Sequence, residues 1–201
     1  MSADKHTRAE AMESRVMRTL DDIGLGASEM ELIRAAHRLA MAHRLQLLDD
    51  AHDPALLHPG RTVLILTLDV AFRDAAGLAA AALVESEQPE LRVTSAVVQK
   101  SLGHELAAWV AAVPIAGDGL TETLVTAPHA VRLVALAERL DQCRHAKFWA
   151  DRDARLRAHE QAQAVYGPVA ERTDAALARR FAHWSRAFAE RLRQENQIAP
   201  E

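Results

Sequence analysis

The side chains best suited to chemistry gather on one stretch, Ala130 to Lys147. It contains no Pro or Gly, and at about 100° per residue its apolar side chains share one stripe, which predicts a core-facing helix. Glu138, Asp141 and His145 lie beside that stripe, because steps of three, four and seven residues return to one side of a helix. Carboxylate and imidazole groups can ligate a metal or carry protons. Spacing alone favours a surface helix with ordinary ion pairs. The stripe comprises Leu133, Leu136, Ala137, Leu140 and Cys143.

Residues 132–144 resemble the late helix of HD-domain phosphohydrolases of the Rel/SpoT type, which hydrolyse (p)ppGpp. The family form reads roughly Lys-Leu-Ala-Asp-Arg-Leu-x-Asn-x-Arg, and its Asp ligates the metal. Glu138 stands at that Asp and Gln142 at the Asn. The resemblance implies Glu138 as a metal ligand and Gln142 as a catalytic candidate. It adds Asp141 and Arg144 as ligand-binding candidates.

Three further segments follow the family order, so that the resemblance covers about residues 36–172. An early family helix often reads Ala-x-x-x-His, and His43 keeps that spacing, with a partly buried, hydrogen-bonded histidine as the alternative. His58 followed by Pro resembles Tyr-Ile-x-His-Pro, whose His is the first metal ligand. Residues 164–172 resemble the terminal Tyr-x-Pro-Leu-Ala-x-Arg. The resemblance therefore implies His43 as a ligand-binding candidate and His58 as a metal ligand.

The segment 77–89 resembles the family helix Ala-Ala-x-Leu-His-Asp-x-x-Glu-Asp with its functional positions changed. In the family, the His-Asp doublet binds the metal and the Glu-Asp pair positions or activates water. Here Val84 replaces the His, Glu85 replaces the Asp, and Gln88 with Pro89 replaces the Glu-Asp pair. A register one residue later puts Glu85 at the His and Ser86 at the Asp. Neither register restores the doublet.

These changes weaken the metal site that the resemblance implies. Valine has no lone pair, so Val84 cannot ligate and the set shrinks to His58, Glu85 and Glu138. Three protein ligands can hold a divalent ion when water fills the open positions. Each Glu is longer than Asp by a methylene, so bond lengths near roughly 2.0 to 2.2 Å need compensating backbone shifts. We expect Mn²⁺ or another divalent metal to bind weakly or not at all.

Water activation is impaired as well. Gln88 cannot act as a general base, since an amide takes up no proton near neutral pH. Glu87 is the nearest substitute, but on a helix one residue turns the side chain by about 100°. Glu87, Gln88 and Gln142 are the catalytic candidates on this interpretation.

Composition bounds the class of protein. The 201 residues are 49% hydrophobic and only 4% aromatic, which favours one mostly helical domain with a sizeable core. A net charge of −4 gives the chain no excess of positive charge, so we do not expect nucleic acid as a main partner. The lone Cys143 has no cysteine partner. No apolar run reaches membrane-spanning length and the start lacks a signal-peptide core, so we expect no membrane association and a cytoplasmic location.

The predicted fold is all-α: a single HD-domain-like helical bundle with an extra C-terminal amphipathic helix. We divide the chain into an N-terminal helix (1–27), the HD-like domain (28–172) and the C-terminal helix (173–201). Ser28 and Glu31 form a capping-box signature for the second helix. Residues 62–70 fit a buried strand or a helix, and the resemblance favours the helix. The predicted helices span about 7–23, 28–48, 62–70, 77–89, 94–103, 104–113, 130–147 and 173–195, with a loop at 114–121.

The C-terminal helix carries an aromatic stripe, Leu177, Phe181, Trp184, Phe188 and Leu192. This stripe can pack on the domain, which we take as the default, or on a second subunit to form a homodimer.

Two functional hypotheses of different class follow. The favoured one is a degenerate, catalytically silent HD domain that binds a guanosine nucleotide or a protein partner. The alternative is a working metal-dependent nucleotide pyrophosphohydrolase, a (p)ppGpp hydrolase with a remodelled metal site. A purely structural helical module comes third.

Overall fold

The structure, a computed structural model, describes residues 2–115 and 119–198, and these residues form an all-α bundle without strands. None of the helices in this part is long and apolar enough to cross a membrane. The α-helices are α1 (Ser2–Asp22), α2 (Ala27–Leu47), α3 (His58–Leu64), α4 (Ala75–Leu83), α5 (Ser95–Leu102), α6 (His104–Ala112), α7 (Leu120–Thr126), α8 (His129–His145), α9 (Arg152–Gln161), α10 (Gly167–Glu171) and α11 (Ala175–Ile198). Shorter turns lie between them: η1 (Pro54–Leu57), η2 (Ile65–Asp69), η3 (Pro89–Leu91), η4 (Ala146–Phe148) and η5 (Ala162–Tyr166).

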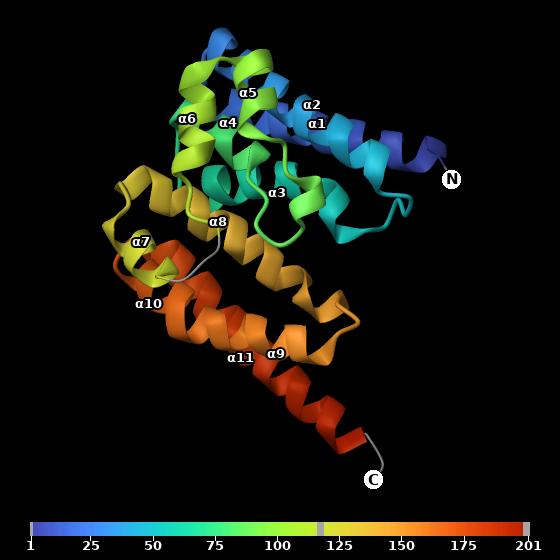
Figure 1. Cartoon of the computed structure of the whole chain (residues 1–201), viewed down its shortest axis with the longest axis vertical. Helices are drawn as coiled ribbons and strands as arrows, with labels where there is room; N and C mark the ends of the chain where they lie inside the picture. The colour runs from blue at the N-terminus through green and yellow to red at the C-terminus, as the bar shows by residue number, and fades with distance from the viewer. Residues whose placement is uncertain (1, 116–118, 199–201) are drawn as a thin grey trace.

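Helix α8 is the middle layer of the bundle. Figure 1 shows it crossing between a group that contains α1 to α6 and a group that contains α7 and α9 to α11. It packs on α3 and α4 on one side and on α11 on the other. All five residues of its predicted apolar stripe are buried, which confirms the core-facing helix. Glu138 and Asp141 are each only 1% exposed, so the interpretation as a surface helix was wrong.

Helix α4 is buried on all sides and packs on α2, α3, α6 and α8. Every residue from Gly77 to Leu83 is buried, as expected for a short helix of Gly, Ala and Leu in a core. The helix ends at Leu83, and Val84 is extended, with ψ 135°. The predicted helix over 77–89 was therefore too long. The carboxylate of Glu85 accepts hydrogen bonds from the backbone N–H groups of residues 87 and 88. These bonds take the place of the backbone hydrogen bonds that a continued helix would form.

Residues 62–69 are helical, as the resemblance favoured for 62–70. Helix α3 continues directly into the π-type turn η2, in which Ile65 and Leu66 are buried. The apolar character of these residues reflects burial in the core rather than strand pairing.

Helix α2 differs from its prediction in its start and in its buried face. It begins at Ala27, where Glu29 rather than Glu31 accepts the N–H of Gly26, so the predicted capping box was misplaced. His43 is only partly buried, whereas Arg44 is fully buried. The buried face is Ile33, Ala36, His37, Ala40, Met41 and Arg44. The loop expected at 114–121 falls partly outside the described residues, and α7 already begins at Leu120.

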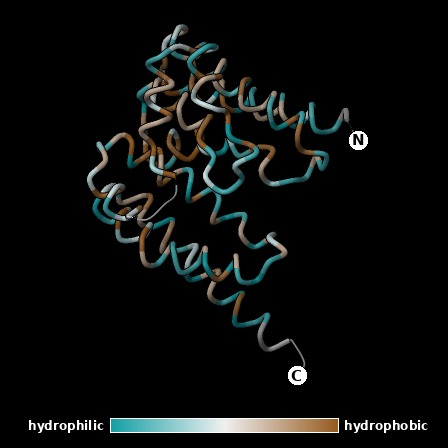
Figure 2. Tube along the Cα trace, in the orientation of Figure 1, coloured by the Kyte–Doolittle hydropathy of each residue, from teal (hydrophilic) through white to brown (hydrophobic). Residues whose placement is uncertain are grey.

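Helix α11 buries its aromatic stripe within the chain. Hydrophobic and hydrophilic residues alternate along it (Figure 2), and the five stripe residues are at most 9% exposed. The stripe packs toward α8, α9 and α10. The default of packing within the chain thus accounts for the stripe, and homodimerisation remains a prediction.

Candidate functional site

The three candidate metal ligands come together under one small pocket. His58 opens α3, Glu85 lies in the segment after α4, and Glu138 lies on α8. All three are at most 2% exposed. The Nε2 atom of His58 lies 3.7 Å from Glu138 Oε1, and the side-chain amide of Gln142 donates to Glu85 Oε1 at 2.8 Å and approaches Glu138 Oε1 at 3.4 Å. The helices thus bring these residues together, and the partners of each carboxylate decide what they can do.

Both oxygens of Glu85 already have partners. Oε2 accepts a hydrogen bond of 2.7 Å from the guanidinium of Arg44, and the pair is fully buried. Oε1 accepts from Gln142 and from two backbone N–H groups. Arg44 is itself satisfied, because it also donates to the carbonyl oxygens of Ala55 and Leu91. A buried, hydrogen-bonded cation therefore neutralises this carboxylate.

Glu138 is engaged in the same way. Its Oε1 accepts from the backbone N–H of Ser86 at 3.0 Å and from the Ser86 hydroxyl at 2.7 Å. Its Oε2 lies 3.5 Å from Nε of Arg139, whose Nη1 donates to Glu87 at 3.0 Å. Arg139 also places its guanidinium carbon 5.6 Å from the ring centroid of Tyr166. One oxygen of this carboxylate is therefore hydrogen-bonded, and the other lies beside the Arg139 guanidinium without a hydrogen bond.

His58 is held by Asp141 rather than by a free carboxylate. Its Nδ1 lies 2.8 Å from Asp141 Oδ2, and Arg61 donates to both oxygens of the same carboxylate. Burial by itself lowers the pKa of His58, but the hydrogen bond and charge of Asp141 outweigh it and raise that pKa above its ordinary value. Burial likewise acts to raise the pKa of Asp141, but His58 and Arg61 bring it well below its usual range. The result is an imidazole–carboxylate–guanidinium chain.

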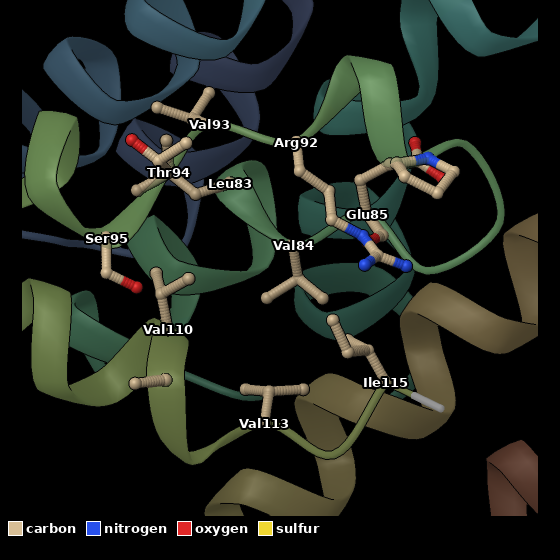
Figure 3. A pocket seen from close by; sticks show the side chains of 12 residues that line it. Leu83, Val84, Glu85, Arg92, Val93, Thr94, Ser95, Val110, Val113 and Ile115 are labelled. Carbon is tan, nitrogen blue, oxygen red and sulfur yellow. The ribbon is translucent and has the colours of Figure 1, made fainter. Parts of the chain in front are cut away.

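Val84 lies in the wall of a second cavity, which Glu85 also lines. Figure 3 shows its side chain directed into an apolar cavity beside Val113 and Ile115. This cavity has a volume of about 340 Å³, and Val84 is 2% exposed. The position at which the resemblance expects a ligating His is thus part of an apolar wall.

These residues do not fit a divalent metal ion. Ligation needs free lone pairs, but both oxygens of Glu85 and Oε1 of Glu138 accept hydrogen bonds, and Arg44 places a positive charge against Glu85. Within residues 2–115 and 119–198, no group of three or more His, Cys, Asp or Glu side chains could hold a metal ion. A metal bound to Glu85 would have to compete with the Arg44 guanidinium for that carboxylate.

The catalytic candidates are placed around this network. Gln142 bridges Glu85 and Glu138, and Gln88 lines the pocket above His58. Glu87 lies on the other side, toward a cavity of about 480 Å³ that Arg139 and Tyr166 also line. Burial raises the pKa of Glu87, although the neighbouring Arg139 opposes this. Glu87 thus lies near the network, but it faces a different cavity and not the pocket above His58.

The ligand-binding candidates are divided. His43 lies apart and bonds to the carbonyl oxygen of Glu90 at 2.9 Å, as in the alternative considered for it. Asp141 is bound to His58 and Arg61 inside the network, and Arg144 lines a separate groove between α8 and α11. The pocket above His58 has a volume of about 180 Å³. Its walls include His58, Arg61, Gln88, Gln142, Phe148 and Trp149.

Sequence reasoning missed the cations of this site, Arg44, Arg61 and Arg139. Arg44 lies four residues after Ala40 on the buried face of α2, and a charged residue in that position is a signal of a buried ion pair. Arg139 follows Glu138 inside the matched helix and was passed over as part of the motif. Arg61 follows His58 by three residues, one helical turn, and its spacing alone names no partner.

Comparison with known proteins supports the fold. No protein-family model matches the chain, and no curated protein sequence does so either. Among solved structures, it is similar to a metazoan ortholog of SpoT that hydrolyses ppGpp and plays a role in starvation responses. The TM-score is 0.61 at 19% sequence identity, over 81% of this chain and 96% of that chain. The all-α, SpoT-like fold that the resemblance implied is therefore confirmed.

Proposed function

We propose that this chain, which has the fold of a ppGpp hydrolase, is a catalytically silent domain that binds a guanosine nucleotide without a metal. The observation that carries the proposal is the buried ion pair of Arg44 with Glu85. A guanidinium there supplies the positive charge that the Glu85 carboxylate needs, so Glu85 is compensated without a divalent ion.

Hydrolysis needs groups that this network does not supply. A metal-bound hydroxide with an adjacent base contributes several kcal/mol to lowering the barrier, and each 1.4 kcal/mol or so is about tenfold in rate. Val84 offers no ligand atom and Gln88 offers no base. Turnover should therefore lie orders of magnitude below that of a working hydrolase.

Binding depends on other features. The pocket above His58 combines hydrogen-bonding groups with the aromatic side chains of Phe148 and Trp149 at its wall. Aromatic rings stack on bases, and amide and charged donors suit the polar edge of a guanine. Such contacts are separable from metal chemistry, so nucleotide binding can persist where hydrolysis is lost.

The test measures both properties on the purified protein. With Mn²⁺ present, we expect no pyrophosphate release from ppGpp above background. Calorimetric titration of ppGpp should give the same affinity in Mn²⁺ and in EDTA. Trp149→Ala should weaken binding, whereas Leu68→Ala, which removes an exposed apolar residue outside the pocket, should not.

Two results would count against the proposal. Metal-dependent hydrolysis at ordinary enzyme rates, lost on His58→Ala, would establish the alternative, a remodelled hydrolase. The absence of any ppGpp binding would remove the nucleotide as the ligand.

A further inference from the structure

A cationic, aromatic groove runs beside the pocket above His58. It lies between the C-terminal end of α8 with η4 and helix α11, and has a volume of about 670 Å³. The groove and the pocket share Arg61, His145 and Phe148 in their linings, so they are neighbours across these side chains. The pocket, at about 180 Å³, is small for a whole nucleotide, whereas ligand sites usually measure about 300 to 1,000 Å³.

Three cations of this groove have weak partners or none among the described residues. Arg144 lies 3.9 Å from Asp69 and makes no hydrogen bond there. Arg191 lies 3.7 Å from Glu195, one turn along the same helix. Lys147 is exposed, with its ammonium 4.8 Å from the Phe148 ring centroid. Burial lowers the pKa of Arg144, although Asp141 opposes this, so an anion bound beside it would relieve an unfavourable desolvation.

The acidic residues of the groove do not cancel these cations. Asp141 is occupied by His58 and Arg61. Glu190 pairs with Arg193 at 2.7 Å. The groove therefore presents uncompensated positive charge to a ligand.

Aromatic side chains line the groove beside its cations and offer a second type of contact to a ligand. Trp184 and Phe188 stack with centroids 4.7 Å apart in the floor of the groove. Phe148 is 63% exposed and stacks on His145 at 6.3 Å, on the boundary that the groove shares with the pocket. An exposed ring at this boundary offers a face to the sugar or base of a ligand that spans both spaces.

We propose that the phosphate groups of the bound nucleotide lie in this groove, on Arg144, Lys147 and Arg191, and not over the carboxylates below the pocket. The inference rests on the proposed function and names the phosphate subsite of that ligand. The carboxylates below the pocket are buried and offer a phosphate no hydrogen-bond donor, whereas guanidinium and ammonium groups bind phosphate directly. Binding through exposed cations also makes affinity fall as salt rises.

The test compares two double variants in EDTA, by calorimetry with ppGpp, guanosine and inorganic pyrophosphate. Lys147→Ala with Arg191→Ala removes two groove cations that do not line the pocket. Lys100→Ala with Arg186→Ala makes the same charge change at two exposed helical positions outside the groove. All four residues are exposed, and thermal midpoints of the two variants are compared to exclude a folding effect.

We expect the groove variant to lose about 10- to 100-fold in ppGpp affinity and to keep its guanosine affinity, with no change in the control. Equal ppGpp affinity in wild type and groove variant would overturn the phosphate subsite and leave the proposed function standing. Pyrophosphate binding that the groove variant loses, without any binding of guanosine or ppGpp to wild type, would instead refute the proposed function and keep the groove as an anion site.

Discussion

At the scale of single residues, Arg44 governs whether a metal centre can be restored. Replacing the altered positions alone, by Val84→His, Glu85→Asp, Gln88→Glu, Pro89→Asp and Glu138→Asp, leaves the guanidinium in place. We expect this quintuple variant to bind Mn²⁺ no better than wild type, because the cation repels a second one. Adding Arg44→Met should raise Mn²⁺ affinity, measured by calorimetry, and should make the thermal midpoint depend on Mn²⁺.

Arg38→Met is the matched control for this experiment. Arg38 lies on the same helix but is exposed and pairs with Glu13 at 2.7 Å. Adding it to the quintuple variant should leave Mn²⁺ affinity unchanged. Tight Mn²⁺ binding by the quintuple variant with Arg44 intact would show that Arg44 does not block the site.

At the scale of elements, the packing of α4 requires a glycine at its first turn. A Cβ atom on Gly77 would come within 2.6 Å of the Phe72 ring. Gly→Ala in a helix normally stabilises by up to about 1 kcal/mol, but overpacking a core costs roughly 1 to 3 kcal/mol. We expect Gly77→Ala to lower the free energy of unfolding in urea, and Phe72→Leu to reduce that loss in a double-mutant cycle. An unchanged or raised stability would contradict the close approach.

The longer helices of the core were predictable, whereas the short helices α7, α9 and α10, the helix ends and the charged contacts were not. The spacing of apolar residues located α8 and α11, because a core-facing stripe can be recognised from the sequence of that helix alone. The end of α4 at Leu83 depends on a turn made by the Glu85 side chain, which local pattern does not reveal. Arg44 and Glu85 are 41 residues apart, so only the folded chain shows that they pair. The resemblance brought His58, Glu85 and Glu138 to one place but could not show their hydrogen-bond partners.

At the scale of the whole molecule, buried histidines make stability depend on pH. His37 is 0% exposed, and burial lowers its pKa from 6.5 to about 4. The folded chain keeps it neutral while the unfolded chain takes up a proton below about pH 6.5, so stability falls as the pH drops from 6.5 toward 4. The full effect is roughly 3 kcal/mol. His58 acts oppositely: its raised pKa gives stability at low pH that is lost as the pH rises through its folded value.

Urea unfolding at pH 7, 6 and 5 tests the His37 contribution. His37→Leu should flatten the loss of stability between pH 6.5 and 4, because it removes the group that protonates only on unfolding. His43→Leu is the control, since that histidine is only partly buried. An equally steep loss in the His37→Leu variant would show that other groups cause the acid sensitivity.

The ion pair of Arg44 and Glu85 also constrains how this sequence can change with time. Removing either partner alone leaves an uncompensated buried charge, which costs about 3 to 5 kcal/mol, a large share of the stability of a typical domain. Each residue is therefore difficult to replace while its partner is still present. A lineage that carries both residues cannot replace one of them without passing through a strongly destabilised protein. A return to metal chemistry therefore requires correlated changes at both positions rather than a succession of single, separately tolerated substitutions.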